Sequence, residues 1–230
     1  VNASGAEALY FNPAGLAKGS VGSEVSLNLS PQFPQSQGPY TTDNENLSSN
    51  TPMGITGGLL YNYNITPDLG VGVGAYVGAG VNANFDNVTY ANYTLNTKLQ
   101  NSLAVEEIAL GVGYQLIPGL KIGAALRASW VSAEVAGSSE SALPAAAGGG
   151  RILTYTDHQG LSDRQIGAYN AGVQYAPSKD WGIGLDYRSK VDFFAKGTTN
   201  AQYQIIGNGA GFNGTGNLGT ASSTTVSSSL

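Results

Sequence analysis

The sequence predicts an all-β protein whose strands belong to an antiparallel transmembrane β-barrel. Three observations support this prediction. Apolar and polar residues alternate with period two over long runs, short turns alternate with long polar connections, and aromatic residues gather beside the short turns. Strands of soluble β-sandwiches are typically about 5 to 6 residues long, whereas crossing a bilayer with tilt takes about 9 to 11. The length of the alternating runs therefore favours the barrel.

One single strand and three hairpins account for the alternating pattern. The first strand is expected over 21–30, and each hairpin has a short turn rich in proline, aspartate or glycine. The predicted hairpin strands are 55–65 with 69–80, 108–116 with 120–130, and 169–175 with 181–187. Polar connections are expected over 31–52, 82–96, 137–163 and from 195 to the end, with low-complexity and mobile residues over 207–229. These seven strands are an odd number, so the chain is expected to be part of a longer barrel.

Composition argues against several other classes of protein. The charged fraction is 11%, less than half of the roughly 25% usual in soluble domains, which argues against an ordinary cytosolic enzyme. A net charge of -5 with only 10 basic residues argues against a nucleic-acid partner. The chain has no cysteine and a single histidine, His158, so thiolate and imidazole metal clusters are excluded. We expect no catalytic residues, no metal site and no cofactor.

Aromatic residues are predicted to mark one membrane interface. They lie on the apolar strand face next to the short turns, where a girdle belongs. This candidate girdle consists of Tyr61, Tyr63, Tyr114, Tyr175 and Trp181. Tyrosine is also a good strand residue in general, and that simpler explanation stays open.

The alternation changes phase at Glu106-Glu107. Apolar residues occupy odd positions up to Val105 and even positions from Ile108 onward. A β-bulge, a kink, or the point where the strand leaves the membrane would each explain this change.

The polar strand faces are expected to line the lumen. Arg127, Arg188 and Lys190 are candidate lumen ligand-binding residues, because a guanidinium group offers a planar fork to a carboxylate. The alternative is that these cations pair with acidic residues across the lumen and brace it.

A segment at the start of the chain does not alternate and resembles a known family. Residues 6–17 read as a short helical or turn-rich piece that contains Asn12-Pro13-Ala14, and the segment 187–191 (Tyr-Arg-Ser-Lys-Val) follows 167–172. In these motifs and their order, the chain resembles the long-chain fatty acid transporter family of the Gram-negative outer membrane, the FadL/TodX type. The resemblance extends over nearly the whole chain.

The resemblance implies a 14-stranded barrel plugged by an N-terminal hatch. Residues 1–18 would be the C-terminal part of this hatch, with the hatch motif Asn12, Pro13 and Ala14. Residues 19–230 would be the N-terminal half of the barrel, ending in an extracellular loop. The complete protein is then expected to be a monomer that contacts outer-membrane lipids and the outer-membrane assembly machinery.

The resemblance also implies passive transport of long-chain fatty acids or similar hydrophobic compounds. The ligand would leave sideways where the third strand kinks, which here places the lateral gate at Gly78, Ala79 and Gly80. Asn12 is expected to hydrogen-bond the backbone freed by that kink. Two alternatives are a water-filled porin for small polar solutes, which would conduct ions, and a secreted β-rich adhesin, which would need no detergent for extraction.

Overall fold

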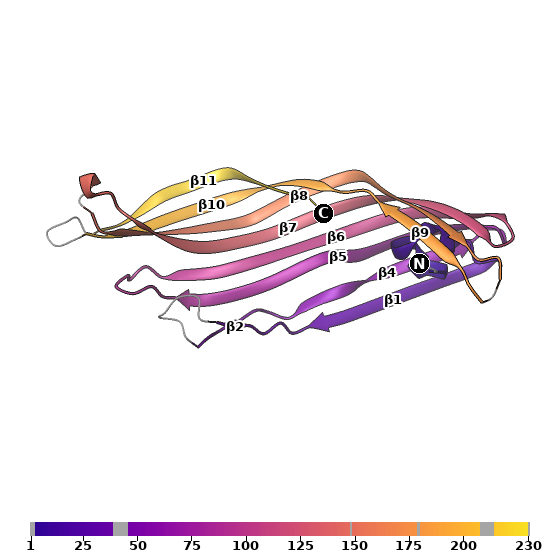
Figure 1. The fold of residues 1–230 in the computed structure, drawn as a ribbon, viewed down its shortest axis with the longest axis horizontal. Helices are drawn as coiled ribbons and strands as arrows, with labels where there is room; N and C mark the ends of the chain where they lie inside the picture. Colours follow the sequence, from indigo (N-terminus) through magenta and orange to yellow (C-terminus); the bar gives the residue numbers. More distant parts are fainter. Residues whose placement is uncertain (1–2, 39–45, 148, 179, 208–213, 230) are drawn as a thin grey trace.

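The described residues, 3–38, 46–147, 149–178, 180–207 and 214–229 in a computed structural model, form one long, curved antiparallel sheet (Figure 1). The main sheet has nine strands in the order β1-β4-β5-β6-β7-β8-β10-β11, and β9 also pairs with β8. Their bounds are β1 Gly22–Gln32, β4 Gly54–Asn64, β5 Leu69–Val88, β6 Thr97–Ile117, β7 Leu120–Ala142, β8 Arg151–Tyr175, β9 Ile183–Arg188, β10 Asp192–Ile206 and β11 Gly214–Ser229. The all-β, antiparallel prediction is confirmed.

Short helical and strand pieces complete the described chain. The N-terminal segment contains the 3-10 helix η1 Gly5–Glu7, the single-turn α1 Ala8–Phe11 and the 3-10 helix η2 Pro13–Leu16. A small pair of strands, β2 Gln37–Gly38 and β3 Leu47–Ser48, and the 3-10 helix η3 Ala145–Ala147 lie in the connections. None of the helices in the described ranges is long and apolar enough to cross a membrane.

The three predicted hairpins are all present, with their short turns near the N-terminal segment at one end of the sheet (Figure 1). The strands themselves are longer than predicted at the opposite end. β5 continues to Val88, β7 to Ala142, and β8 begins at Arg151, so most of the predicted polar connections are strand. The prediction failed there because it required an apolar outer face, which only a lipid-facing strand needs.

The C-terminal part of the chain also differs from the prediction. Residues 207–229 were expected to be mobile, but 214–229 form β11, which pairs with β10 from Asp192↔Ser229 to Ile205↔Gly214. Serine, threonine and glycine give no hydropathy pattern in this segment. The ladder with β10 pairs the backbone groups along one edge of β11, and this pairing is independent of side-chain hydropathy.

A break separates β9 from β10, although both pair with β8. β9 pairs with residues 170–175 of β8, and β10 pairs with residues 151–162. Between them, Ser189 bonds to Tyr169 through both its backbone N–H and its Oγ, and Asp163 accepts a bond from the Phe194 N–H. Side chains therefore close part of the seam that the ladder leaves unpaired.

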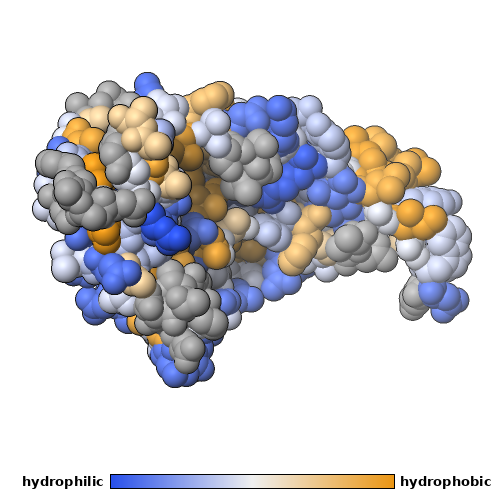
Figure 2. Space-filling view, turned by 60° about the vertical axis from the view of Figure 1, so that its left-hand side comes forward, coloured by the Kyte–Doolittle hydropathy of each residue, from blue (hydrophilic) through white to orange (hydrophobic). Residues whose placement is uncertain are grey.

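The strand faces change character at Glu106-Glu107 without a bulge in β6. β6 pairs with β7 in unbroken register from Gln100 to Gln115, and the extra residue at this level is Gly78 of β5. We call the part of the sheet between the short turns and Glu107 the hatch half, and the remainder the loop half. In Figure 2, where the loop half comes forward, hydrophilic and hydrophobic residues are mixed over its end.

Candidate functional site

The N-terminal segment packs on the inner face of the hatch half and forms the main buried core there. Leu9 and Leu16 are fully buried and contact Leu60, Tyr76 and small residues of β6 and β7. This placement depends on an inner strand face without bulky side chains.

Glycines provide that flat inner face. A Cβ atom at Gly123 would lie 2.2 Å from the carbonyl carbon of Pro13, and one at Gly172 would lie 2.1 Å from Oδ1 of Asn12. Gly70, Gly111 and Gly113 meet the same segment at 2.1 to 2.7 Å. Real Cβ atoms do not approach backbone so closely, so the strands accept the backbone of the N-terminal segment only with glycine at Gly70, Gly113 and Gly123.

Asn12 ties the segment to the far strands of the sheet. Its Nδ2 donates to the carbonyl oxygens of Val173 and Leu185 at 3.2 and 3.1 Å, and its Oδ1 accepts from the Ala14 N–H at 3.1 Å. Val173 and Leu185 face each other across β8 and β9. The expected bond from Asn12 to the third strand is therefore wrong, because the Asn12 side chain reaches β8 and β9 instead of β5.

Polar side chains of the inner face hold the remainder of the segment. Asn62 donates to the Leu16 carbonyl at 3.1 Å, Asn64 accepts from the Lys18 N–H at 2.9 Å, and Gln174 donates to the Ala3 carbonyl at 2.8 Å. Glu24 accepts from the Ala6 N–H and pairs with the Lys18 side chain. These bonds satisfy backbone groups that the short helical turns leave unpaired.

β4 and β5 part from each other at the level of the predicted kink. Their pairing ends at Gly58↔Tyr76, whereas β5 stays paired with β6 well beyond that point. The register shift between Val77 and Ala79 leaves Gly78 unpaired as a bulge, next to the point of separation. The predicted gate residues Gly78, Ala79 and Gly80 thus lie on the β5 side of a local separation in the sheet.

A cavity of about 540 Å³ occupies this separation. Its walls combine outer-face apolar side chains with the inner-face residues Tyr76 and Glu107. The apolar lining residues include Leu27, Leu29, Ile55, Leu59, Ile108 and Trp130. The cavity therefore reaches from the outer apolar surface into the thickness of the sheet.

A second cavity of about 380 Å³ lies beside the N-terminal segment on the inner face. Tyr10 and Phe11 of α1 form one side, and Val191, just before β10, and Phe193 of β10 contribute apolar walls. Its charged lining residues are Glu107, Arg127, Asp186 and Arg188. This luminal cavity therefore combines apolar walls with one concentrated group of charges.

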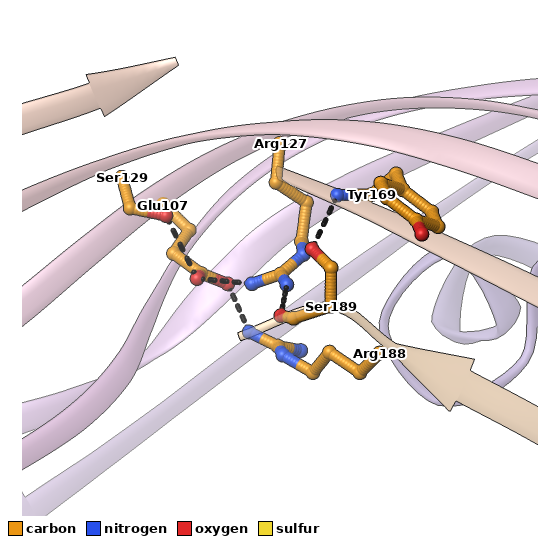
Figure 3. A network of polar contacts seen from close by, with 6 residues as sticks. All are labelled: Glu107, Arg127, Ser129, Tyr169, Arg188 and Ser189. Atoms are coloured by element: carbon orange, nitrogen blue, oxygen red, sulfur yellow. Dashed lines mark hydrogen bonds and ion pairs between the residues drawn. The ribbon is translucent and has the colours of Figure 1, made fainter. Parts of the chain in front are cut away.

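An ion-pair network centres on the carboxylate of Glu107 (Figure 3). Arg127 Nη1 lies 2.6 Å from Glu107 Oε1, Arg188 pairs with Oε2, and Ser129 Oγ donates to Oε1 at 3.0 Å. Arg127 also donates to the Ser189 carbonyl at 2.8 Å, at the break between β9 and β10. The network links β6, β7 and the β9–β10 seam.

The three predicted ligand-binding cations have different environments. The Arg127 side chain is 1% exposed, whereas that of Arg188 is 34% exposed and lies 5.4 Å above the Tyr10 ring. Lys190 is exposed, pairs with Asp192 at 2.9 Å, and lines neither cavity. The structure thus brings Arg127 and Arg188 together on Glu107 and leaves Lys190 outside.

The predicted girdle residues share one face and one end of the sheet. Tyr61, Tyr63, Tyr114, Tyr175 and Trp181 are all exposed on the face opposite the N-terminal segment, and the Tyr175 and Trp181 rings meet edge to face at 6.1 Å. Their role at the interface stays a prediction.

Glu107 and Ser129 were missed as site residues by the sequence analysis. The register of the hairpin around Ile117-Pro118-Gly119 places Glu107 opposite Ser129, and Ala109 opposite Arg127. Counting outward from this turn would have placed Glu107 and Arg127 on one face as diagonal neighbours. The length of the hairpin thus contains the signal for this pair. The apolar alternation by itself marks Glu106-Glu107 only as the point where its phase changes.

Comparison with known proteins identifies relatives of this architecture. The model of the family described as "Outer membrane protein transport protein (OMPP1/FadL/TodX)" matches residues 1–230. No curated protein matches the chain significantly. Among solved structures, the chain is similar to the toluene transporter TodX of P. putida, with 17% identity, 94% of this chain and 58% of that chain covered, and a TM-score of 0.67.

A second similar structure is a FadL homologue of Pseudomonas aeruginosa, with 14% identity, 84% of this chain and 49% of that chain covered, and a TM-score of 0.58. The chain thus spans roughly half the length of these two proteins. Its fold is that of part of a barrel like theirs. Since the family model matches every residue, the chain belongs to the outer-membrane transport family OMPP1/FadL/TodX.

Proposed function

We propose that this chain is part of a passive transporter that moves long-chain fatty acids or similar hydrophobic compounds across the outer membrane. One observation supports this most directly: a luminal cavity beside the N-terminal segment and an apolar cavity between β4 and β5 adjoin at Glu107. A hydrophobic ligand could pass from the first into the second and reach lipid without crossing water. Such movement follows a concentration gradient and the hydrophobic effect, without an enzymatic step.

The N-terminal segment acts in this proposal as the plug of the lumen. Its buried core and its bonds to β1, β4, β8 and β9 support a fixed position. In the complete protein, a monomer inserted by the outer-membrane assembly machinery, the plug would prevent continuous flow of water and ions.

Asn12→Ala in the full-length protein tests the plug. Removing the amide leaves the Val173 and Leu185 carbonyls without this donor at a buried position, a cost of about 1–3 kcal/mol. We expect slower uptake of radiolabelled laurate with an intact barrel, checked as a heat-modifiable band on gels. Unchanged uptake would reject the role of the hatch motif.

Transport itself is tested with the full-length protein in planar bilayers and in cells. Faster laurate or toluene uptake than in cells without the protein, together with little ion conductance, is expected. High conductance without retained hydrophobic ligand would favour the water-filled porin. Extraction by salt or urea without detergent would favour the adhesin.

Arg188 is the best candidate for contact with an anionic head group. Its guanidinium is partly exposed to the luminal cavity, whereas Arg127 is enclosed by Glu107 and the Ser189 carbonyl. Arg188→Ala is expected to weaken laurate binding more than binding of uncharged 1-dodecanol. Equal effects on both ligands would reject an anion site.

A further inference from the structure

We propose that the Glu107 side chain is the barrier between the luminal cavity and the opening between β4 and β5, and that its ion pairs with Arg127 and Arg188 hold this barrier closed. The inference rests on the proposed transport function and adds a gate residue to it. Among the described residues that line the two cavities, Glu107 is the one common to both. A ligand that moves between them must therefore pass this side chain.

The bulge in β5 gives Glu107 the space to occupy this position. A Cβ atom at Gly78 would lie 3.2 Å from Cδ of Glu107 and 3.4 Å from its Cγ. Because Gly78 has no side chain, the glutamate extends across the level at which β4 and β5 have separated. The glycine therefore contributes both the local break in pairing and the room for the barrier.

Three neighbouring groups fix the position of the carboxylate. Arg127 and Ser129 project from β7 and bind Oε1, while Arg188 of β9 binds Oε2 (Figure 3). The Glu107 side chain is 4% exposed, so the loss of a partner would leave a poorly solvated charge. This penalty keeps the side chain in place while the network is complete.

The two arginines differ in how easily they can release Glu107. Arg127 is enclosed and also bound to the Ser189 carbonyl, so its pair is a fixed anchor. Arg188 is partly exposed in the luminal cavity, where a ligand can contact it. Displacement of Arg188 is therefore the step that would free Glu107 to swing away from the opening.

The test uses the full-length protein with toluene as an uncharged probe, since removal of a carboxylate changes attraction for charged ligands. Uptake of radiolabelled toluene is measured for wild type, Glu107→Ala, Glu107→Gln and Arg188→Gln. We expect roughly three- to tenfold faster uptake for Glu107→Ala, because a lower barrier raises the rate exponentially. Glu107→Gln keeps the volume but loses the charge, and Arg188→Gln loosens one side, so both should be faster than wild type by smaller factors.

Glu134→Gln is the matched control, since Glu134 is exposed in the loop half, lines neither cavity and accepts a hydrogen bond from the Gln100 amide. It should transport toluene like wild type. If Glu107→Ala fails to fold, Glu107→Gln and Arg188→Gln decide: uptake at or below the wild-type rate in both overturns the gate. If wild type itself is no faster than cells without the protein, the proposed function has failed, and the gate fails with it.

Discussion

The hatch half and the loop half of the sheet have opposite polarity on the same strands. In the hatch half, the outer face carries exposed apolar side chains such as Leu110 and Leu126, and the inner face is glycine and amide. In the loop half, the inner face carries the apolar cluster that includes Val131 and Phe193, and outer positions such as Ser132 are exposed and polar. Yet β7 runs through both halves in unbroken register with β6, from Lys121↔Gln115 to Ala136↔Gln100.

The two halves of the sheet are therefore suited to different surroundings, lipid around the hatch half and water around the loop half. The outer face of the hatch half suits lipid, while its inner face holds the N-terminal segment. The outer face of the loop half suits water, so its apolar residues turn inward. The boundary lies at the cross-strand row Glu106, Trp130 and Arg164, next to the Glu107 network.

The largest loss of stability is expected from breaking the Glu107 network. It is compared with the loss caused by breaking an exposed ion pair in the loop half. Arg127→Leu leaves the buried Glu107 with one arginine, and breaking a buried pair costs about 3–5 kcal/mol. The measurement is the urea concentration at which the folded band disappears. Arg151→Leu removes an exposed pair with Glu140 and should cost under about 1 kcal/mol. Equal losses of stability in the two variants would mean that the buried network contributes no more than an exposed ion pair.

The next prediction tests the lipid boundary on a single strand. Leu126 and Ser132 lie on the same outer face of β7, six positions apart in the sequence and on opposite sides of the boundary row. Leu126→Arg should cost about 2–4 kcal/mol, because a lipid-facing cation near the midplane is poorly solvated. Ser132→Arg should be close to neutral by the same urea assay. A large cost at Ser132 would place the boundary nearer the loops.

A smaller effect is expected from crowding the inner face. Gly123→Ala adds a Cβ that would meet the Pro13 backbone, and such overpacking costs about 1–3 kcal/mol. The displaced plug should also raise ion conductance in planar bilayers. The matched change Gly137→Ala in the loop half meets its nearest atom, Cδ1 of Leu99, at 3.9 Å, an ordinary contact, and should leave stability and conductance unchanged. If Gly123→Ala has the same conductance as wild type, the position of the N-terminal segment does not depend on this glycine.

The sequence alone predicted the hatch half well and the loop half poorly. Period-two alternation around Leu69–Val77 or Ile108–Leu116 directly reflects a strand with a lipid-facing side, so its hairpins were found with the correct turns. In β11 and the outer part of β7, serine, threonine and glycine leave no such contrast. These segments are strands because they pair with neighbouring strands that are distant in the sequence. A hydropathy pattern along the chain does not reveal such pairing.

The candidate site was predicted only in part for a related reason. Arg127 and Arg188 were selected as charges on a luminal face, but their common partner depends on how β6, β7 and β9 converge. The bonds of Asn12 likewise depend on which strands the N-terminal segment crosses. Packing of non-alternating segments on a sheet is a tertiary property, and spacing along the chain does not encode it.

The last prediction involves the smallest loss of stability and locates the two membrane boundaries. Trp181 lies beside the short turns and Trp130 in the boundary row, so they mark opposite ends of the apolar band. Variants of the full-length protein that keep only one of them, with phenylalanine at other tryptophan positions, should lose under about 1.5 kcal/mol per substitution, because the volume change is modest. In bilayers with brominated lipids, both should be quenched more by bromine near the head groups than by bromine near the chain ends, since indole rings favour the interface. Strong quenching of Trp130 by deep bromine would move the lipid boundary into the loop half and contradict the change of polarity at Glu107.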